Sequence, residues 1–181
     1  MLLKSSSLES IKLLDWEKEH GRIPDRAAVV FHFDWSKKFL QPQEYAGSKD
    51  IGNLFSFRHP AVSEAAGMWL ADERNIKMIA TDTLTPDPLG LTKRQITTLP
   101  IHVRYSKEKR LIVENLKDTG KLPPRGFRLF AVPYKFDGAS GAPTRTFAIT
   151  HDELGTGGAS VLSASLFGVF LSVWTLYLLI H

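Results

Sequence analysis

The 181-residue sequence contains no cysteine, which excludes disulfides, thiolate metal sites and a cysteine nucleophile. It also lacks a Gly-x-Ser-x-Gly nucleophile elbow, so a serine hydrolase of the α/β-hydrolase type is not expected. The glycine-rich stretch 138–143 lacks the Lys-Ser/Thr ending of a phosphate-binding loop. The 23 lysines and arginines exceed the 19 acidic residues by only four and are scattered, apart from residues 107–110, so no nucleic-acid partner is expected.

The length allows one domain, and a hydrophobic content of 43% is ordinary for a chain that buries a core. Ser6-x-x-Glu9 is a capping box that predicts the start of a helix through residue 19, and Ser63 is a candidate N-cap for a second helix at 62–70. Residues 36–59 and 82–90 are predicted to be loops. Strands outnumber helices, which predicts a mixed α/β class, and the predicted strands are 27–33, 77–81, 111–113, 127–132 and 146–149.

The C-terminus departs from this pattern, because residues 161–180 contain no charge and are about long enough to cross a bilayer. Small residues at 155–160 precede this tail, an order typical of a glycosylphosphatidylinositol signal with attachment at Gly157. A retained membrane anchor and a buried C-terminal helix are the alternatives. We therefore divide the chain into a domain at 1–150, a linker at 151–160 and a tail at 161–181. The tail predicts a membrane-associated protein at the cell surface or in the secretory pathway.

His102 and Glu114, twelve residues apart, are the candidate metal ligands. Imidazole and carboxylate together suit Zn²⁺, and Mn²⁺ accepts them too. A short turn or helix between them could bring both side chains to one ion. By composition alone, however, such a pair carries little weight.

The pair stands in register with further motifs: Glu114-Asn115-Leu116, the Leu-Pro-Pro-Arg-Gly of 122–126, and Gly-Ala-Ser-Gly-Ala-Pro-x-Arg-x-Phe-Ala at 138–148. The stretch Trp-Glu-x-Glu-His-Gly-Arg-Ile-Pro at 16–24 precedes a predicted central strand. In this order the sequence resembles the cyclase family of metal-dependent amide hydrolases, which includes bacterial kynurenine formamidase and isatin hydrolase. The resemblance covers about residues 8–150.

The resemblance implies a swivelling β/β/α domain, a homodimer, and His102 and Glu114 as the last two protein ligands of a Zn²⁺ or Mn²⁺ site. It also implies hydrolysis of a small aromatic amide, such as N-formylkynurenine to kynurenine and formate in tryptophan catabolism. The family's other ligands come from a His-x-Gly-Thr-His-x-Asp-x-Pro motif, which this sequence lacks. Met1–Lys4 opens no signal peptide either. We therefore expect an N-terminally incomplete domain that is inactive alone; a membrane-anchored, non-catalytic binding module derived from the enzyme is the alternative.

Four other residues near these motifs have either a binding or a structural role. Asp82 opens a loop that resembles a family loop near the active site, and either substrate binding or simple turn chemistry explains it. Trp35 could line an aromatic substrate pocket or pack in the core. We interpret His32 as structural, and Asp34 stands where the family often has glycine.

Overall fold

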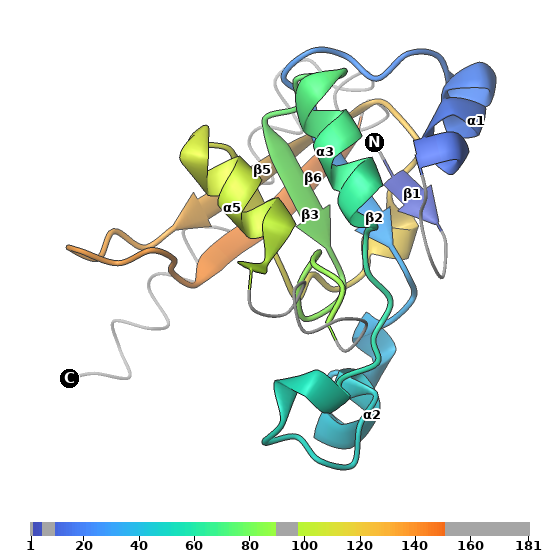
Figure 1. The fold of residues 1–181 in the computed structure, drawn as a ribbon. Coiled ribbons are helices and arrows are strands. Elements are labelled where there is room, and N and C mark those ends of the chain that lie inside the picture. Colours follow the sequence, from blue (N-terminus) through green and yellow to red (C-terminus); the bar gives the residue numbers. More distant parts are fainter. Residues whose placement is uncertain (1, 5–9, 90–97, 151–181) are drawn as a thin grey trace, which may run out of the picture.

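The computed structural model describes residues 2–4, 10–89 and 98–150 and shows a mixed α/β fold. The helices and strands follow one another along the chain as shown in Figure 1: β1 (Leu2–Lys4), α1 (Ser10–His20), β2 (Ala28–His32), α2 (Pro42–Ala46), α3 (Glu64–Asp72), β3 (Met78–Thr81), α5 (Pro100–Lys107), β4 (Leu111–Val113), β5 (Phe127–Pro133) and β6 (Thr144–Thr150).

Strands β1 to β4 form a parallel sheet in the order β1-β2-β3-β4. In the register of its central strands, Val29 pairs with Ile79, which in turn pairs with Ile112. Because the strands are parallel, all of their carboxyl ends lie at one edge, where the loops that follow them meet. β5 and β6 form a separate antiparallel hairpin, paired from Phe127 with Thr150 to Pro133 with Thr144.

The two faces of the parallel sheet are covered by different elements. Side chains alternate along each strand, so Val29 and Phe31 pack on one side with the helices and Val30 on the other with the hairpin. The helix side holds the larger core, built from α1, α3 and α5; on the opposite side Phe127, Leu129 and Ala131 of β5 pack against the sheet. The molecule is therefore three layers of helices, parallel sheet and hairpin, with α3 and α5 in front of the sheet and the hairpin behind it in Figure 1.

Two close approaches fix the helices. A Cβ on Gly67 of α3 would lie 2.7 Å from Cγ1 of Ile101, so glycine lets α3 and α5 pack in direct contact. At the end of α1, Gly21 has a φ of +83°, and Arg125 donates hydrogen bonds to the carbonyl oxygens of His20 and Arg22. Gly21 adopts this backbone conformation without strain because it has no side chain. Arg125 thus connects the end of α1 to the Leu-Pro-Pro-Arg-Gly motif, which lies more than 100 residues later in the sequence.

Most predicted elements are confirmed within one or two residues, including the N-cap at Ser63, whose Oγ accepts a hydrogen bond from the Ala66 amide. The prediction of one long loop at 36–59 was wrong, since it contains α2 and two 3₁₀ turns at Ser36–Lys38 and Leu54–Ser56. Pro42 at the start of α2 and Gly47 after it, with a φ of +66°, are the local signals for that helix. β1 was not predicted either.

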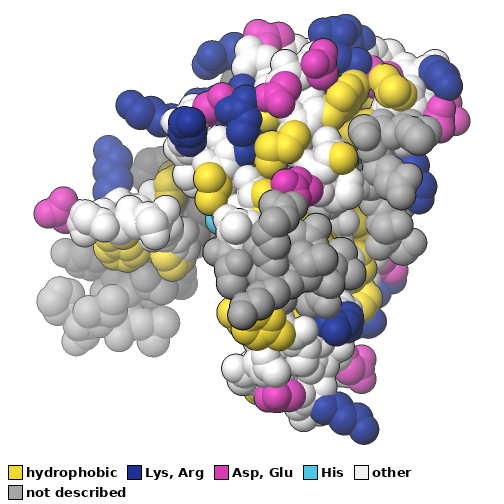
Figure 2. Space-filling view, in the orientation of Figure 1, with side chains coloured by type: hydrophobic (Ala, Val, Ile, Leu, Met, Phe, Trp, Pro, Cys, Tyr) yellow, Lys and Arg dark blue, Asp and Glu magenta, His cyan; other side chains and the backbone are white. Residues whose placement is uncertain are grey.

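Three predictions concern residues outside the described part of the chain: the capping box at Ser6 and Glu9, the linker and attachment site at Gly157, and the tail at 161–180. Within the described ranges, no helix is long and apolar enough to cross a membrane. On the face seen in Figure 2, side chains of both charges are mixed and do not separate by sign.

Candidate metal site

The candidate site lies at the carboxyl edge of the parallel sheet. Glu114 follows β4 directly, and the loop after it is hydrogen-bonded to the end of β3: the amides of Asn115 and Leu116 donate to the carbonyl oxygens of Thr83 and Thr81, at 3.0 Å each. Asn115 also accepts a hydrogen bond of 2.7 Å from the Tyr45 hydroxyl. These bonds explain why Glu-Asn-Leu occurs as a unit, since they fix the backbone that carries Glu114.

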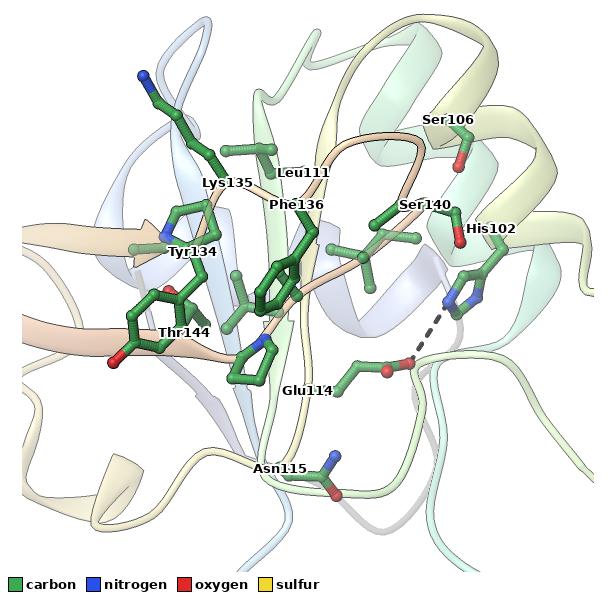
Figure 3. A pocket seen from close by; sticks show the side chains of 18 of the residues that line it. His102, Ser106, Leu111, Glu114, Asn115, Tyr134, Lys135, Phe136, Ser140 and Thr144 are labelled. Atoms are coloured by element: carbon green, nitrogen blue, oxygen red, sulfur yellow. Dashed lines mark ion pairs between the residues drawn. The ribbon is translucent and has the colours of Figure 1, made fainter.

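The structure brings His102 and Glu114 together. His102 lies in the first turn of α5, and its Nε2 is 3.5 Å from Oε1 of Glu114. The two side chains point toward one another across the opening between α5 and the end of β4 (Figure 3). They are 33% and 30% exposed, so both are accessible from the solvent side yet partly enclosed. Their metal-ligand role stays a prediction, but its geometric requirement is met.

The charges around the pair perturb both groups. The hydrogen bond from His102 to Asp87, with the nearby Glu114 charge, raises the pKa of the His102 imidazole against the opposing effect of burial. Burial raises the pKa of the Glu114 carboxyl, partly offset by the His102 imidazole and the Thr85 hydroxyl. An added cation at this point would favour the ionised form of Glu114.

One carboxylate oxygen of this pair has no hydrogen-bond donor, which leaves it free to bind a cation. Oε1 of Glu114 is buried and accepts no hydrogen bond, because its separation from His102 is too long for one. A buried carboxylate oxygen without a donor is costly, and a metal ion would satisfy it. The donor set of imidazole nitrogen and carboxylate oxygen therefore fits Zn²⁺ or Mn²⁺. Among the described residues, however, no group of three or more histidines and acidic residues could hold a metal.

A cavity of about 830 Å³ opens beside the pair. One wall is formed by α5 and β4, and the other by residues 134–143, which connect β5 to β6. This connection contains the glycine-rich stretch 138–143. From it, the aromatic rings of Tyr134 and Phe136 reach the cavity, 70% and 58% exposed, with ring centroids 6.1 Å apart (Figure 3).

Asp82, the first predicted substrate-binding residue, is fully buried. Its carboxylate accepts hydrogen bonds from the amides of Phe33 and Trp35, at 2.9 and 3.1 Å, and so fixes the chain after β2. Its oxygens also lie near His32 and Thr119, which hydrogen-bond to each other at 2.8 Å. Substrate binding by Asp82 stays a prediction, and the burial weighs against it.

Trp35 is the second predicted substrate-binding residue. Its indole Nε1 donates to the Tyr45 carbonyl oxygen at 2.8 Å, and the ammonium of Lys38 lies 3.4 Å from its ring centroid. It is absent from the residues lining the cavity, so its proposed contact with a substrate also stays a prediction. The neighbouring Asp34 has a φ of +59°, the left-handed conformation that glycine adopts without strain, which explains why the family often has glycine there.

Comparison with known proteins shows which family this chain resembles. The family model Cyclase, described as "Putative cyclase", matches residues 4–88. An isatin hydrolase from Roseibium aggregatum is 25% identical over 138 residues, covering 74% of this chain and 49% of that protein. Isatin hydrolase A from Ralstonia solanacearum has a similar structure, with 30% identity and a TM-score of 0.67 over 81% of this chain and 52% of that one. Together these matches support a cyclase-family, isatin hydrolase-like identity for this chain.

A second solved cyclase-family structure, isatin hydrolase A from Labrenzia aggregata bound to benzyl benzoate, gives 26% identity and a TM-score of 0.70. It is matched over 82% of this chain and 59% of its own. The chain thus spans about half the length of the cyclase relatives it matches. The partial cyclase fold is confirmed, whereas the family-model match ends at residue 88, before His102 and Glu114.

Three residues at the site were missed by the analysis of the sequence. Asp87 contacts His102, and Tyr134 and Phe136 line the cavity. A signal for Asp87 existed: α5 begins with Leu99 and Pro100, neither of which can cap a helix with its side chain, so an acceptor had to come from elsewhere. No sequence signal distinguished Tyr134 and Phe136 from other exposed aromatic residues.

Proposed function

We propose that this cyclase-family chain supplies His102 and Glu114 to the divalent-metal site, Zn²⁺ or Mn²⁺, of an amide hydrolase. The observation that carries the proposal is their convergence: Nε2 of His102 lies 3.5 Å from a buried carboxylate oxygen that has no hydrogen-bond donor. A purely structural ion pair would normally satisfy that oxygen.

A divalent cation at this point would supply polarisation of the scissile carbonyl and a lowered pKa for water. The chain's own residues perform the remaining tasks. His102 in the first turn of α5 and Glu114 directly after β4 would hold the cation, and the connection at 134–143 would border the substrate on the opposite side.

The lining of the cavity supports a proposal for the substrate class. The rings of Tyr134 and Phe136 provide an apolar surface against which a flat aromatic ring can stack. A small aromatic amide fits this surface, and N-formylkynurenine, cleaved to kynurenine and formate in tryptophan catabolism, is our specific candidate. Isatin is a second candidate, because the named relatives are isatin hydrolases and one of them holds benzyl benzoate.

Metal binding by variants tests this proposal. We expect His102→Ala and Glu114→Gln each to lower Zn²⁺ affinity at least tenfold, measured by competition with a fluorescent chelator, because each removes one of two ligands. His20→Ala, which removes a histidine at the end of α1, is the control and should leave affinity unchanged. Equal affinity in all variants would show that the metal binds elsewhere.

Catalysis by this chain alone is a separate question. Catalytic zinc normally has three protein ligands, and the described residues offer no group of three. We therefore propose that the 181 residues alone do not hydrolyse N-formylkynurenine or isatin, and that ligands supplied from outside them complete the site. Metal-dependent hydrolysis by the purified chain would contradict this.

The same incomplete ligand set favours a second candidate, a non-catalytic binding module anchored to membranes through residues 161–180. The proposed homodimer and the location at the cell surface or in the secretory pathway belong to either candidate. Binding of the aromatic ligand in the presence of a metal chelator would favour the module, whereas binding that requires metal would favour the enzyme. Release of the protein from membranes by a phospholipase that cleaves glycosylphosphatidylinositol would distinguish a lipid anchor from a retained helix.

A further inference from the structure

Asp87 is a fully buried carboxylate in the loop between β3 and α5. Its two oxygens accept three hydrogen bonds, all from the first turn of α5. The amides of Ile101 and His102 donate at 2.8 and 3.1 Å, and Nδ1 of the His102 ring lies 2.7 Å from Oδ2. Asp87 therefore contacts both the backbone and the side chain of a predicted metal ligand.

The backbone contacts explain why α5 begins where it does. The residue before the helix, Leu99, caps no amide with its side chain, and Pro100 has no amide hydrogen to satisfy. Asp87 supplies the missing acceptor from a separate loop, and its negative charge is favourable at a helix N-terminus. This position also brings its carboxylate within 2.7 Å of Nδ1 of His102.

The side-chain contact has a chemical consequence. An ionised carboxylate only accepts hydrogen bonds, so the ring nitrogen that faces it must carry a hydrogen. In neutral His102 that hydrogen lies on Nδ1, and Nε2 keeps its lone pair. Nε2 is the atom that lies 3.5 Å from Oε1 of Glu114.

We propose that Asp87 is a positioning residue that selects the Nδ1–H tautomer of His102 and so directs the unprotonated Nε2 toward the same point as the Glu114 carboxylate. The inference rests on the proposed metal site for its purpose, because only an unprotonated nitrogen binds a metal. The tautomer itself exists without metal and can be measured without it.

Asparagine at position 87 would reverse the arrangement. Its amide oxygen at the Oδ1 position can still accept from the Ile101 amide, and its NH₂ group at the Oδ2 position would donate to Nδ1 of His102, while the His102 amide loses its acceptor. The ring would then accept at Nδ1 and carry its hydrogen on Nε2, where it blocks a metal. A buried Asp-to-Asn change at a histidine of a serine protease has this effect on the tautomer.

The test is nitrogen NMR of the metal-free chain labelled with ¹⁵N-histidine, recorded at increasing pH until the His102 signals reach their neutral-imidazole plateau. His102→Gln identifies the signals of His102 among the six histidines. We expect wild-type His102 to show a hydrogen-bearing Nδ1 and a bare Nε2, Asp87→Asn to show the reverse, and Asp87→Glu to restore the wild-type pattern. Glu17→Gln, which removes a carboxylate on α1 that accepts hydrogen bonds from Arg74 and the Ile23 amide, is the control and should leave His102 unchanged.

Zinc affinity gives the second readout. We expect Asp87→Asn to weaken Zn²⁺ binding about 10- to 100-fold, the usual effect of losing such a partner, and Glu17→Gln to leave it unchanged. A hydrogen on Nε2 in the wild type, an unchanged tautomer in Asp87→Asn, or a reversed tautomer with full zinc affinity would each overturn the inference. If Asp87→Asn does not fold, the wild-type spectrum still decides. If the wild type binds no zinc, the proposed function fails, and the tautomer spectra judge the inference separately.

Discussion

Replacing Glu114 by glutamine separates a metal ligand from a structural partner of His102, because the two roles predict opposite effects on stability. The ionised carboxylate has a buried oxygen without a donor, a defect that costs about 1–3 kcal/mol. Its attraction to His102 at 3.5 Å, with both side chains about one-third exposed, returns at most about 1 kcal/mol. Without metal, Glu114→Gln should therefore stabilise the chain by about 1 kcal/mol.

Urea unfolding measures this difference. With a slope of about 2 kcal/mol per molar urea, the midpoint of Glu114→Gln in EDTA should rise by about 0.5 M. In Zn²⁺ at 100 times the wild-type dissociation constant, the wild type gains about 2.7 kcal/mol, whereas a variant with at least tenfold weaker affinity gains at most about 1.4 kcal/mol. The wild type then becomes the more stable protein by about 0.3 kcal/mol or more. The order of the two proteins thus reverses on adding metal. A Glu114→Gln variant that is less stable than wild type in EDTA, with no reversal in Zn²⁺, would refute the reasoning and make Glu114 a structural residue.

Three further predictions concern other parts of the chain. Arg74 holds the pKa of Glu17 below its ordinary value of 4.5, so the pair stabilises the fold above that pH and its contribution disappears as the pH falls through the lowered pKa. Glu17→Gln should therefore cost about 2 kcal/mol at pH 7 and progressively less as the pH is lowered below 4.5, measured by urea unfolding. Gly47→Ala should cost roughly 2 kcal/mol more than Gly138→Ala in the same assay: both glycines have positive φ, but a Cβ on Gly47 would lie 2.2 Å from a carbonyl oxygen and one on Gly138 meets nothing within 4 Å. Phe136→Ala should weaken binding of isatin about tenfold by titration calorimetry while leaving Zn²⁺ affinity unchanged, because the ring contributes about 1.4 kcal/mol of stacking; an unchanged isatin affinity would remove Phe136 from the binding surface.

The sequence predicted the elements whose signals are local. Continuous apolar runs at β2 and β3 are buried on both faces, as parallel strands between two layers must be, and Ser63 caps α3 by accepting a hydrogen bond from the Ala66 amide, three residues later. α2 was missed because it has only five residues and its signal is one proline and one glycine. β1 was missed because three residues at an edge show no periodicity.

The residues of the site also differ in how far the sequence alone could predict them. The pairing of His102 with Glu114 was predictable only through the resemblance, since nothing in the spacing itself fixes how α5 returns to β4. Asp87 was beyond local analysis because its three hydrogen bonds cross 14 or 15 residues of chain. Asp82 shows what a strand-end motif leaves open: its place after a strand suggested substrate binding, which stays a prediction, and did not reveal that its carboxylate fixes the backbone of Phe33 and Trp35.

The most direct test of the central claim is anomalous diffraction at the zinc absorption edge from crystals of the protein grown with Zn²⁺. We predict one peak about 2.0–2.2 Å from both Nε2 of His102 and a carboxylate oxygen of Glu114. A peak bound to other residues, or none between these two side chains at saturating zinc, would contradict the account.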